Sequence, residues 1–123
     1  MAEILVVDDQ SYVSDLLADE LTEEGHSITT ISDTQRIWDH LDDSPVDIVL
    51  LDLFLDGPQG WKVLDRIKTQ NPHLPVVIFT AYDTYREDPR LSKAAAYVVK
   101  SFDLNELKGT IRCILDNGGV SHS

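Results

Sequence analysis

The apolar residues of this chain fall into short, uninterrupted runs separated by segments with helical spacing. The run Ile48-Val49-Leu50-Leu51 contains no alternation, which is typical of a strand buried on both faces. Similar runs at 3–7, 75–81 and 97–100 predict three more strands. Residues 27–31 are β-branched and only partly alternating, so they predict a strand nearer a sheet edge.

Apolar positions between these runs recur at helical spacing and predict helices at about 11–24, 34–41, 60–69, 88–95 and 103–117. The polar turn at 8–11 is able to cap the first helix, which is expected to bury Val13, Leu16, Leu17 and Leu21. Asp88-Pro89 suggests a cap for the fourth, which is expected to be short. Strands alternating with helices predict an α/β layer fold with right-handed crossovers and helices on both faces of the sheet.

Polar residues close four of the predicted strands. Asp8 and Asp9 follow the first strand, Asp52 follows 48–51, and Thr80 and Lys100 lie at the ends of later strands. In an open parallel sheet these ends share one edge, where ligands bind. The sequence therefore predicts one site made of three carboxylates, a hydroxyl and an amine, with Asp52 as the reactive group.

Composition limits the possible functions. The chain has 123 residues, enough for one domain with its own core, and a formal charge of −12 that disfavours binding to a nucleic-acid backbone. No run is long enough to span a membrane, and the lone Cys113 excludes an internal disulfide. We expect a cytoplasmic protein, without membrane contact and without a histidine metal site.

Each of these residues also has a plainer interpretation. Asp8 and Asp9 are common helix-capping residues, and Thr80 belongs to a residue type that is frequent in strands. Lys100 would fit a solvated charge at a strand end. Tyr97, in the strand predicted at 97–100, would fit core packing. Asp52 is harder to explain in this way, because an acid that ends an apolar strand gives up solvation without a packing gain.

The ordered set of motifs resembles the receiver domain of bacterial two-component response regulators. The resemblance rests on Val6-Val7-Asp8-Asp9, Leu51-Asp52-Leu53 with Gly60, Thr80-Ala81, and Ala96-Tyr97-Val98-Val99-Lys100 with Phe102, and it covers nearly the whole chain. It implies a flavodoxin-like, doubly wound (βα)5 three-layer sandwich with parallel strand order 2-1-3-4-5. The receiver domain would occupy residues 1–119, followed by a tail at 120–123.

The resemblance also implies a role for each site residue. Asp52 would be the phosphoacceptor, and Mg²⁺ would be held by Asp52, by Asp9 directly, by Asp8 mainly through water and by the backbone carbonyl of Phe54. Thr80 and Lys100 would bind the phosphoryl group. Tyr97 stands at the position of the aromatic switch.

By the same resemblance, the phosphoryl donor would be a phosphohistidine of a sensor histidine kinase or a histidine phosphotransfer protein. The output would be docking of a downstream protein on the surface formed by 88–95, 97–100 and the helix from 103. The chain would be a monomer or a phosphorylation-dependent dimer. It would not be an enzyme beyond its own phosphorylation and dephosphorylation at Asp52.

The sequence departs from the family at several positions. Ser101 follows Lys100 where a proline, commonly joined by a cis bond, is usual, so the Lys100-Ser101 bond is either trans or strained. Asp56 replaces a frequent proline. Phe54 and Tyr82, two residues past Asp52 and Thr80, are bulky and predict a long-lived phosphoryl group because they obstruct hydrolytic water.

Three other functions are alternatives to that of a receiver domain. A haloacid dehalogenase-like, Mg²⁺-dependent phosphohydrolase also uses an aspartyl phosphate, but it requires a second acid where this chain has Phe54. A flavodoxin-like cofactor binder would carry a loop rich in Gly, Ser and Thr after the first strand, where this chain has Asp8 and Asp9. A pseudo-receiver that acts only as a scaffold is the third.

Overall fold

The structure is a computed structural model that describes residues 2–55, 59–101 and 103–120, without the side chains of 59 and 118–120. Five parallel strands form one sheet in the order β2-β1-β3-β4-β5, which confirms the predicted order. Their bounds are β1 (Glu3–Val7), β2 (Ser27–Ile31), β3 (Ile48–Leu51), β4 (Val76–Thr80) and β5 (Ala96–Val99). The partly alternating strand β2 lies at an edge, as its sequence predicted.

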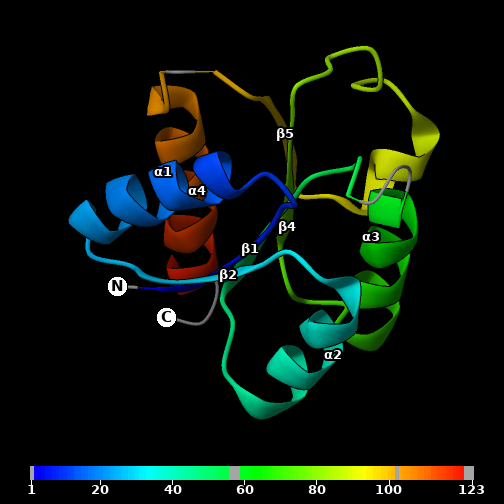
Figure 1. Cartoon of the computed structure of the whole chain (residues 1–123), viewed down its shortest axis with the longest axis horizontal. Coiled ribbons are helices and arrows are strands. Elements are labelled where there is room, and N and C mark those ends of the chain that lie inside the picture. The colour runs from blue at the N-terminus through cyan, green and yellow to red at the C-terminus, as the bar shows by residue number, and fades with distance from the viewer. Residues whose placement is uncertain (1, 56–58, 102, 121–123) are drawn as a thin grey trace.

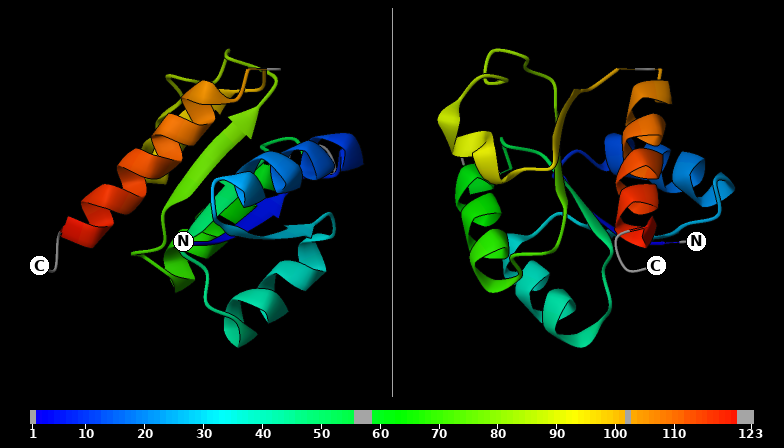
Figure 2. Two further views of the ribbon diagram at one scale, coloured as in Figure 1. Left: turned by 90° about the vertical axis from the view of Figure 1, so that its left-hand side faces the viewer. Right: turned by 180° about the vertical axis from the view of Figure 1, so that it is seen from behind.

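Helices cover both faces of this sheet. Within the described residues they are α1 (Ser11–Glu23), α2 (Thr34–Asp43), α3 (Gln59–Gln70), the 3-10 helix η1 (Pro89–Lys93) and α4 (Asn105–Val120). Figure 1 shows α1 and α4 on one side of the sheet and α2 and α3 on the other. The views in Figure 2 agree, and the ion pairs Lys108–Glu20 and Arg112–Glu24 join α4 to α1.

Two hydrophobic clusters, one on each face, hold the layers together. The first contains residues of α1 and α4 packed on alternate residues of the strands, and the second contains residues of α2, α3 and η1 on the opposite face. β3 and β4 are buried along their whole length, as their unbroken apolar runs predicted. The strand ends that carry the polar residues are therefore fixed by packing on both sides.

The start of α1 differs from the prediction. Its N-cap residue is Gln10, whose side chain makes no capping hydrogen bond, while Asp8 Oδ1 accepts the Gln10 N–H at 2.9 Å within the turn. Leu16 was expected inside but is 40% exposed, and Ser14 is buried on the inner face instead. The apolar stripe of α1 is therefore narrower than its leucines indicated. Gly25, at φ 95°, ends the helix region as expected.

The segment after β4 is also less helical than predicted. The helix expected at 88–95 is only the 3-10 helix η1, although Asp88 caps it through its Oδ1 and the Arg90 N–H as expected. A segment this short gains too few i→i−4 hydrogen bonds to favour an α-helix.

The last helix begins at Asn105, where the Asp103 carboxylate accepts the Asn105 N–H. It continues to Val120, past the predicted stop at 117–119, and residues 121–123 of the predicted tail lie outside the described residues. Glycine lowers helix propensity without ending a helix by itself.

Cys113 is exposed, as its position off the apolar stripe predicted. Among the described residues, no helix combines the length and apolarity needed to cross a membrane.

Candidate functional site

The carboxyl ends of β1 and β3 bring two acids side by side. The strands pair in parallel with Val7 opposite Leu51, so the next residue of each strand, Asp8 or Asp52, leaves the sheet at the same edge. Backbone hydrogen bonds fix both exits: the Asp52 N–H donates to the Val7 carbonyl at 3.1 Å and the Asp8 N–H to the Ile31 carbonyl at 3.2 Å. Strand register therefore places the two carboxylates together.

Asp8, Asp9 and Asp52 form an acidic cluster. Each offers a carboxylate oxygen, and these oxygens all lie within 4.8 Å of one another. Asp8 and Asp52 are buried, while Asp9 is exposed at the mouth of the cluster. The predicted convergence of the three acids is confirmed. Such a set of oxygen donors fits a hard divalent cation, which would relieve the mutual repulsion of the charges.

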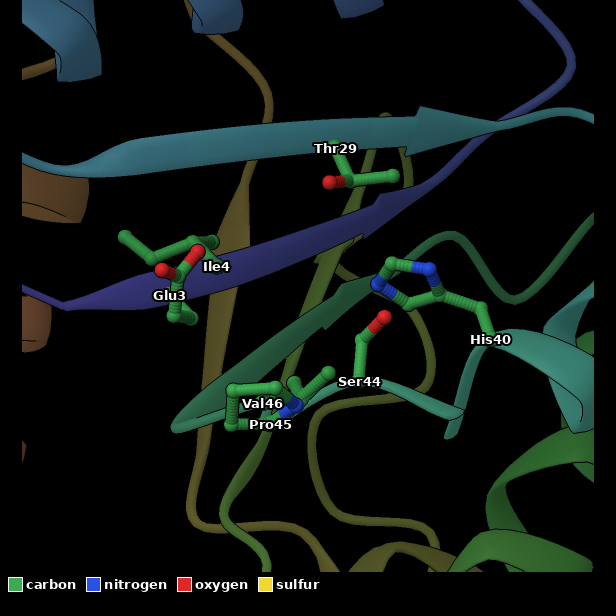
Figure 3. A pocket seen from close by; sticks show the side chains of 7 residues that line it. All are labelled: Glu3, Ile4, Thr29, His40, Ser44, Pro45 and Val46. Carbon is green, nitrogen blue, oxygen red and sulfur yellow. The ribbon is translucent and has the colours of Figure 1, made fainter. Parts of the chain in front are cut away.

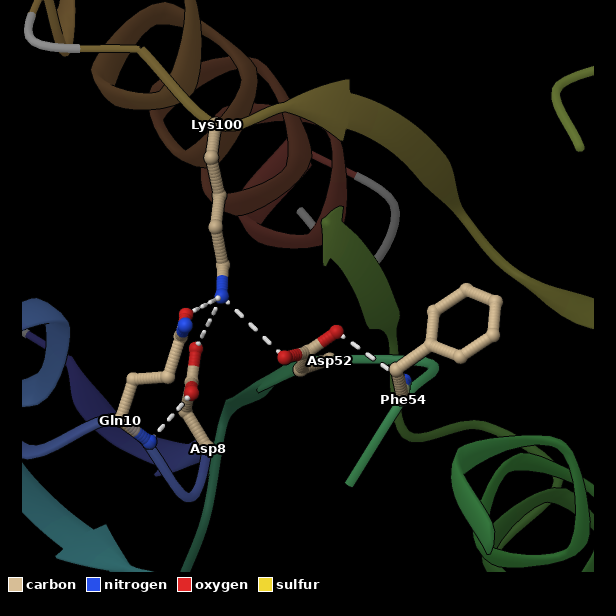
Figure 4. Close-up of polar contacts among 5 residues, drawn as sticks. All are labelled: Asp8, Gln10, Asp52, Phe54 and Lys100. Carbon is tan, nitrogen blue, oxygen red and sulfur yellow. Dashed lines mark hydrogen bonds and ion pairs between the residues drawn. The ribbon is translucent and has the colours of Figure 1, made fainter. Parts of the chain in front are cut away.

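Lys100 extends from the end of β5 into this cluster. Its Nζ lies 2.8 Å from Asp8 Oδ2 and 3.1 Å from Asp52 Oδ2 (Figure 4). Burial alone would lower the pKa of the Lys100 ammonium, but the hydrogen bond to Asp8 and the charges of Asp52 and Asp8 raise it above its ordinary value. Lys100 is therefore held as a cation between the two acids.

Asp8 is the most deeply placed acid of the cluster, with 3% of its surface exposed. Burial raises the pKa of its carboxyl above the ordinary value, although Lys100 and the Gln10 N–H both favour the ionised form. The acidic cluster is thus only partly compensated by Lys100.

Gln10 is a member of the site that sequence reasoning missed. Its Oε1 accepts a hydrogen bond from Lys100 Nζ at 2.8 Å across 90 residues of sequence. Figure 4 shows the Gln10 amide and the two carboxylates arranged around the Lys100 nitrogen. The only available sequence signal was a residue that is a poor N-cap next to the acid pair.

Thr80 ends β4 next to Lys100. Its side chain is fully buried, and its Oγ1 has no hydrogen-bond partner among the described atoms. Its backbone carbonyl accepts the Lys100 N–H at 2.7 Å, so the two residues are joined directly. A buried hydroxyl without a partner is energetically costly, so Thr80 retains a hydrogen-bond donor that no described atom uses.

Aromatic rings border the site on the side of α3. The Phe54 N–H donates to Asp52 Oδ1 at 3.1 Å, and the Phe54 ring packs edge-on against Tyr82 with centroids 4.9 Å apart. The centroid of the Tyr85 ring lies 5.5 Å from that of Phe54, and the Tyr85 ring also contacts the Trp61 ring of α3. The two bulky residues singled out in the sequence therefore touch each other.

Tyr97 lies on β5, half-buried, outside the acidic cluster. Its hydroxyl donates to the backbone carbonyl of Tyr82, and the Arg86 guanidinium lies 5.3 Å from the ring centroid. Arg86 also donates weakly to the Tyr97 carbonyl at 3.4 Å. Tyr97 is thereby attached to the segment between β4 and η1.

Two departures noted in the sequence have different outcomes. The described residues contain no cis peptide bond, so the Lys100-Ser101 bond is trans and Lys100 still reaches Asp8 and Asp52. Asp56 lies outside the described residues.

Gly60, at the start of α3, packs so closely that a Cβ there would collide with the backbone of Asp52 and Leu53.

A separate cavity of about 200 Å³ lies beside β1, β2 and the end of α2 (Figure 3). It is lined by Glu3, Ile4, Thr29, His40, Ser44, Pro45 and Val46, none of which belongs to the predicted site.

Comparisons with known proteins all find response regulators. The family described as "Response regulator receiver domain" matches residues 4–112. The transcriptional regulatory protein TcrA of Mycobacterium tuberculosis (strain H37Rv) is 35% identical over 119 residues, which are 95% of this chain and 47% of TcrA. This chain therefore spans about half the length of that relative.

Solved structures agree with the sequence match. The response regulator TrrA of Thermotoga maritima, crystallised with Mg²⁺-BeF, superposes with a TM-score of 0.87 at 35% identity, over 93% of this chain and 99% of that one. A second crystal structure, of the histidine kinase ThkA in complex with TrrA, gives a TM-score of 0.86 at 36% identity, over 94% and 99%. The chain belongs to the response regulator receiver domain family.

Proposed function

We propose that this receiver domain accepts a phosphoryl group on Asp52. The observation that carries the proposal is the position of the Lys100 ammonium between Asp52 and Asp8, at 3.1 and 2.8 Å. The hydroxyl of Thr80, at the end of the strand that pairs with β5, has no partner among the described atoms. A phosphoryl group attached to Asp52 would need both a cation and a hydrogen-bond donor. Lys100 and Thr80 are able to supply them.

The acidic cluster fits Mg²⁺. Its carboxylates already bind a cation, since the Lys100 ammonium lies among them. We infer that Asp8, Asp9, Asp52 and the Phe54 carbonyl hold the ion, Asp8 mainly through water. When bound, Mg²⁺ would neutralise charge on the phosphoryl oxygens.

The chain's own residues would act mainly by positioning. A carboxylate oxygen of Asp52 forms the O–P bond while the P–N bond of a donor phosphohistidine breaks, and the leaving imidazole keeps the electron pair and takes a proton from water. The Phe54 N–H orients the Asp52 carboxylate from one oxygen, and Lys100 does so from the other. Lys100 then neutralises charge on the transferred group.

We further propose that the donor is a sensor histidine kinase or a histidine phosphotransfer protein. The ThkA–TrrA complex supports this class of partner for a protein of similar fold and sequence. The proposed output surface is formed by η1, β5 and α4, with Thr80 and Tyr97 as the residues that transmit the change. On phosphorylation Thr80 would turn toward the new oxygens and the Tyr97 ring would rotate inward. Unchanged chemical shifts on that surface after a phosphoryl mimic binds would refute this transmission.

Membership of the receiver family argues against the haloacid dehalogenase and cofactor-binding alternatives. The following test also distinguishes a phosphoacceptor from a pseudo-receiver that acts only as a scaffold. The protein is incubated with Mg²⁺ and a small phosphoramidate, and intact mass is measured. We expect addition of one phosphoryl group to the wild type and to Asp15→Asn, an exposed acid on α1, but not to Asp52→Asn. No addition to the wild type would favour the scaffold. Turnover of small phosphate esters would contradict the inference that no separate substrate is processed.

A further inference from the structure

Lys100 Nζ has three hydrogen-bond donors, and the structure provides three acceptors. Two are carboxylate oxygens, Asp8 Oδ2 at 2.8 Å and Asp52 Oδ2 at 3.1 Å, and the third is the amide oxygen of Gln10 at 2.8 Å. The side chain of Lys100 is 13% exposed, so protein groups rather than bulk water surround most of it. Gln10 is the neutral member of this set.

The backbone of Gln10 is held firmly while its side chain serves no local purpose. Its N–H donates to Asp8 Oδ1 at 2.9 Å, and its carbonyl accepts the Val13 and Ser14 N–H groups, each at 3.1 Å. As the N-cap of α1 it occupies a position that favours Ser, Thr, Asp or Asn, yet its side chain makes no capping bond. The side chain instead accepts a hydrogen bond from Lys100, so it contributes to the site and not to its own helix.

The neutrality of this acceptor matters for the reaction. A divalent cation would draw on the oxygens of Asp8 and Asp52, which are the two other acceptors of Lys100. Gln10 is not one of the clustered acids, so it is able to keep its bond to Lys100 during that exchange. An amide also adds no negative charge where a phosphoryl group brings about two more.

We propose that Gln10 is a positioning residue for Lys100, holding the ammonium group over Asp52 while the carboxylates turn toward the metal and the phosphoryl group arrives. The inference rests on the proposed function of Asp52. It adds a role for a residue of the turn between β1 and α1.

The test compares three variants. Gln10→Met keeps the side-chain length and removes the acceptor, while Gln10→Glu keeps an oxygen acceptor at the same distance along the chain. Gln70→Met is the matched control, an exposed glutamine at the end of α3. Since the Gln10 side chain caps nothing, Gln10→Met should unfold within a degree or two of Gln70→Met, and this is checked by thermal denaturation.

Two measurements on these proteins are decisive. With a small phosphoramidate at saturating Mg²⁺, we expect Gln10→Met to be phosphorylated about tenfold more slowly than wild type, the size of one hydrogen bond to a charged group. Its affinity for Mg²⁺ should change less than about twofold, since Gln10 is not an acid of the cluster. The NMR signal of the Lys100 ammonium, visible only when its protons exchange slowly, should broaden in Gln10→Met and return in Gln10→Glu.

The outcomes separate this inference from the proposed function. If the wild type gains no phosphoryl group, the proposed function fails, whatever Gln10 does. If the wild type is phosphorylated but Gln10→Met matches Gln70→Met in rate, the positioning role is wrong. It is also wrong if the slower rate follows an equal loss of Mg²⁺ affinity, or if the Lys100 signal is unchanged in Gln10→Met or absent in Gln10→Glu.

Discussion

The ammonium nitrogen of Lys100 lies 2.8 Å from Oδ2 of Asp8, and the two side chains are 13% and 3% exposed. A cation bound by the acidic cluster must share or replace this contact, because both cations use the same carboxylates. Under the proposed function, Lys100 would compete with the metal at Asp8 and would bind the phosphoryl group on Asp52.

Lys100→Met removes the competing charge and keeps the length of the side chain. We expect Mg²⁺ to bind about tenfold more tightly, because the ion no longer displaces an ammonium group from Asp8. Titration calorimetry measures the dissociation constant, with Lys62→Met, an exposed lysine on α3, as the control. Equal or weaker Mg²⁺ binding in Lys100→Met would show that the two cations do not compete.

Asp8→Asn tests the raised pKa of the Asp8 carboxyl. The folded protein holds this proton more tightly than the unfolded chain, whose value is 3.8, so the carboxyl favours folding most below that pH. That stability is lost as pH rises through the folded pKa. At pH 7 we expect Asp8→Asn to raise the free energy of unfolding by about 1 kcal/mol, and the gain should shrink toward pH 4.

Urea denaturation at both pH values measures this effect. Asp15→Asn, which removes an exposed acid from α1, serves as the control for net charge and should change the free energy by less than about 0.5 kcal/mol. A destabilised Asp8→Asn at pH 7 would mean that the ion pair with Lys100 outweighs the cost of burying the carboxylate.

Gly60→Ala probes the close approach of α3 to the end of β3. An added Cβ would collide with the backbone of Asp52 and Leu53, so we expect a loss of about 3 kcal/mol in stability and a displaced Asp52. Gly109→Ala is the matched helical control, since nothing lies within 4 Å of its Cβ position. It should stabilise the protein by about 0.5–1 kcal/mol. Similar melting shifts for both variants would contradict the collision.

Tyr82→Ala removes the ring that packs against Phe54. If these rings keep water from an aspartyl phosphate, hydrolysis should become roughly tenfold faster when one is lost. The decay of the phosphorylated protein is followed by intact mass, with Tyr12→Ala as the control, since Tyr12 is also an exposed tyrosine, at 70%. An unchanged lifetime would remove the shielding role and the predicted long-lived phosphoryl group with it.

The sequence alone determined the sheet and the convergence of its polar ends. Unbroken apolar runs such as 48–51, four residues long and separated by helical patterns, favour strands covered on both faces, and in a parallel sheet the polar residues that follow them emerge at one edge. This is why Asp8, Asp52 and Lys100 were predicted to meet, and they do. The strand order came from the family resemblance and is also confirmed.

The tertiary structure alone decided which side chains touch within that edge. The Gln10–Lys100 bond spans 90 residues, and the Phe54–Tyr82 contact depends on how two loops lie over the sheet. The exposure of Leu16 likewise depends on which residues of other elements pack against α1. The local sequence specifies which segments are helices or strands and where the strands end. Long-range packing decides which side chains touch, because these contacts join residues that are far apart in the sequence and that no local pattern connects.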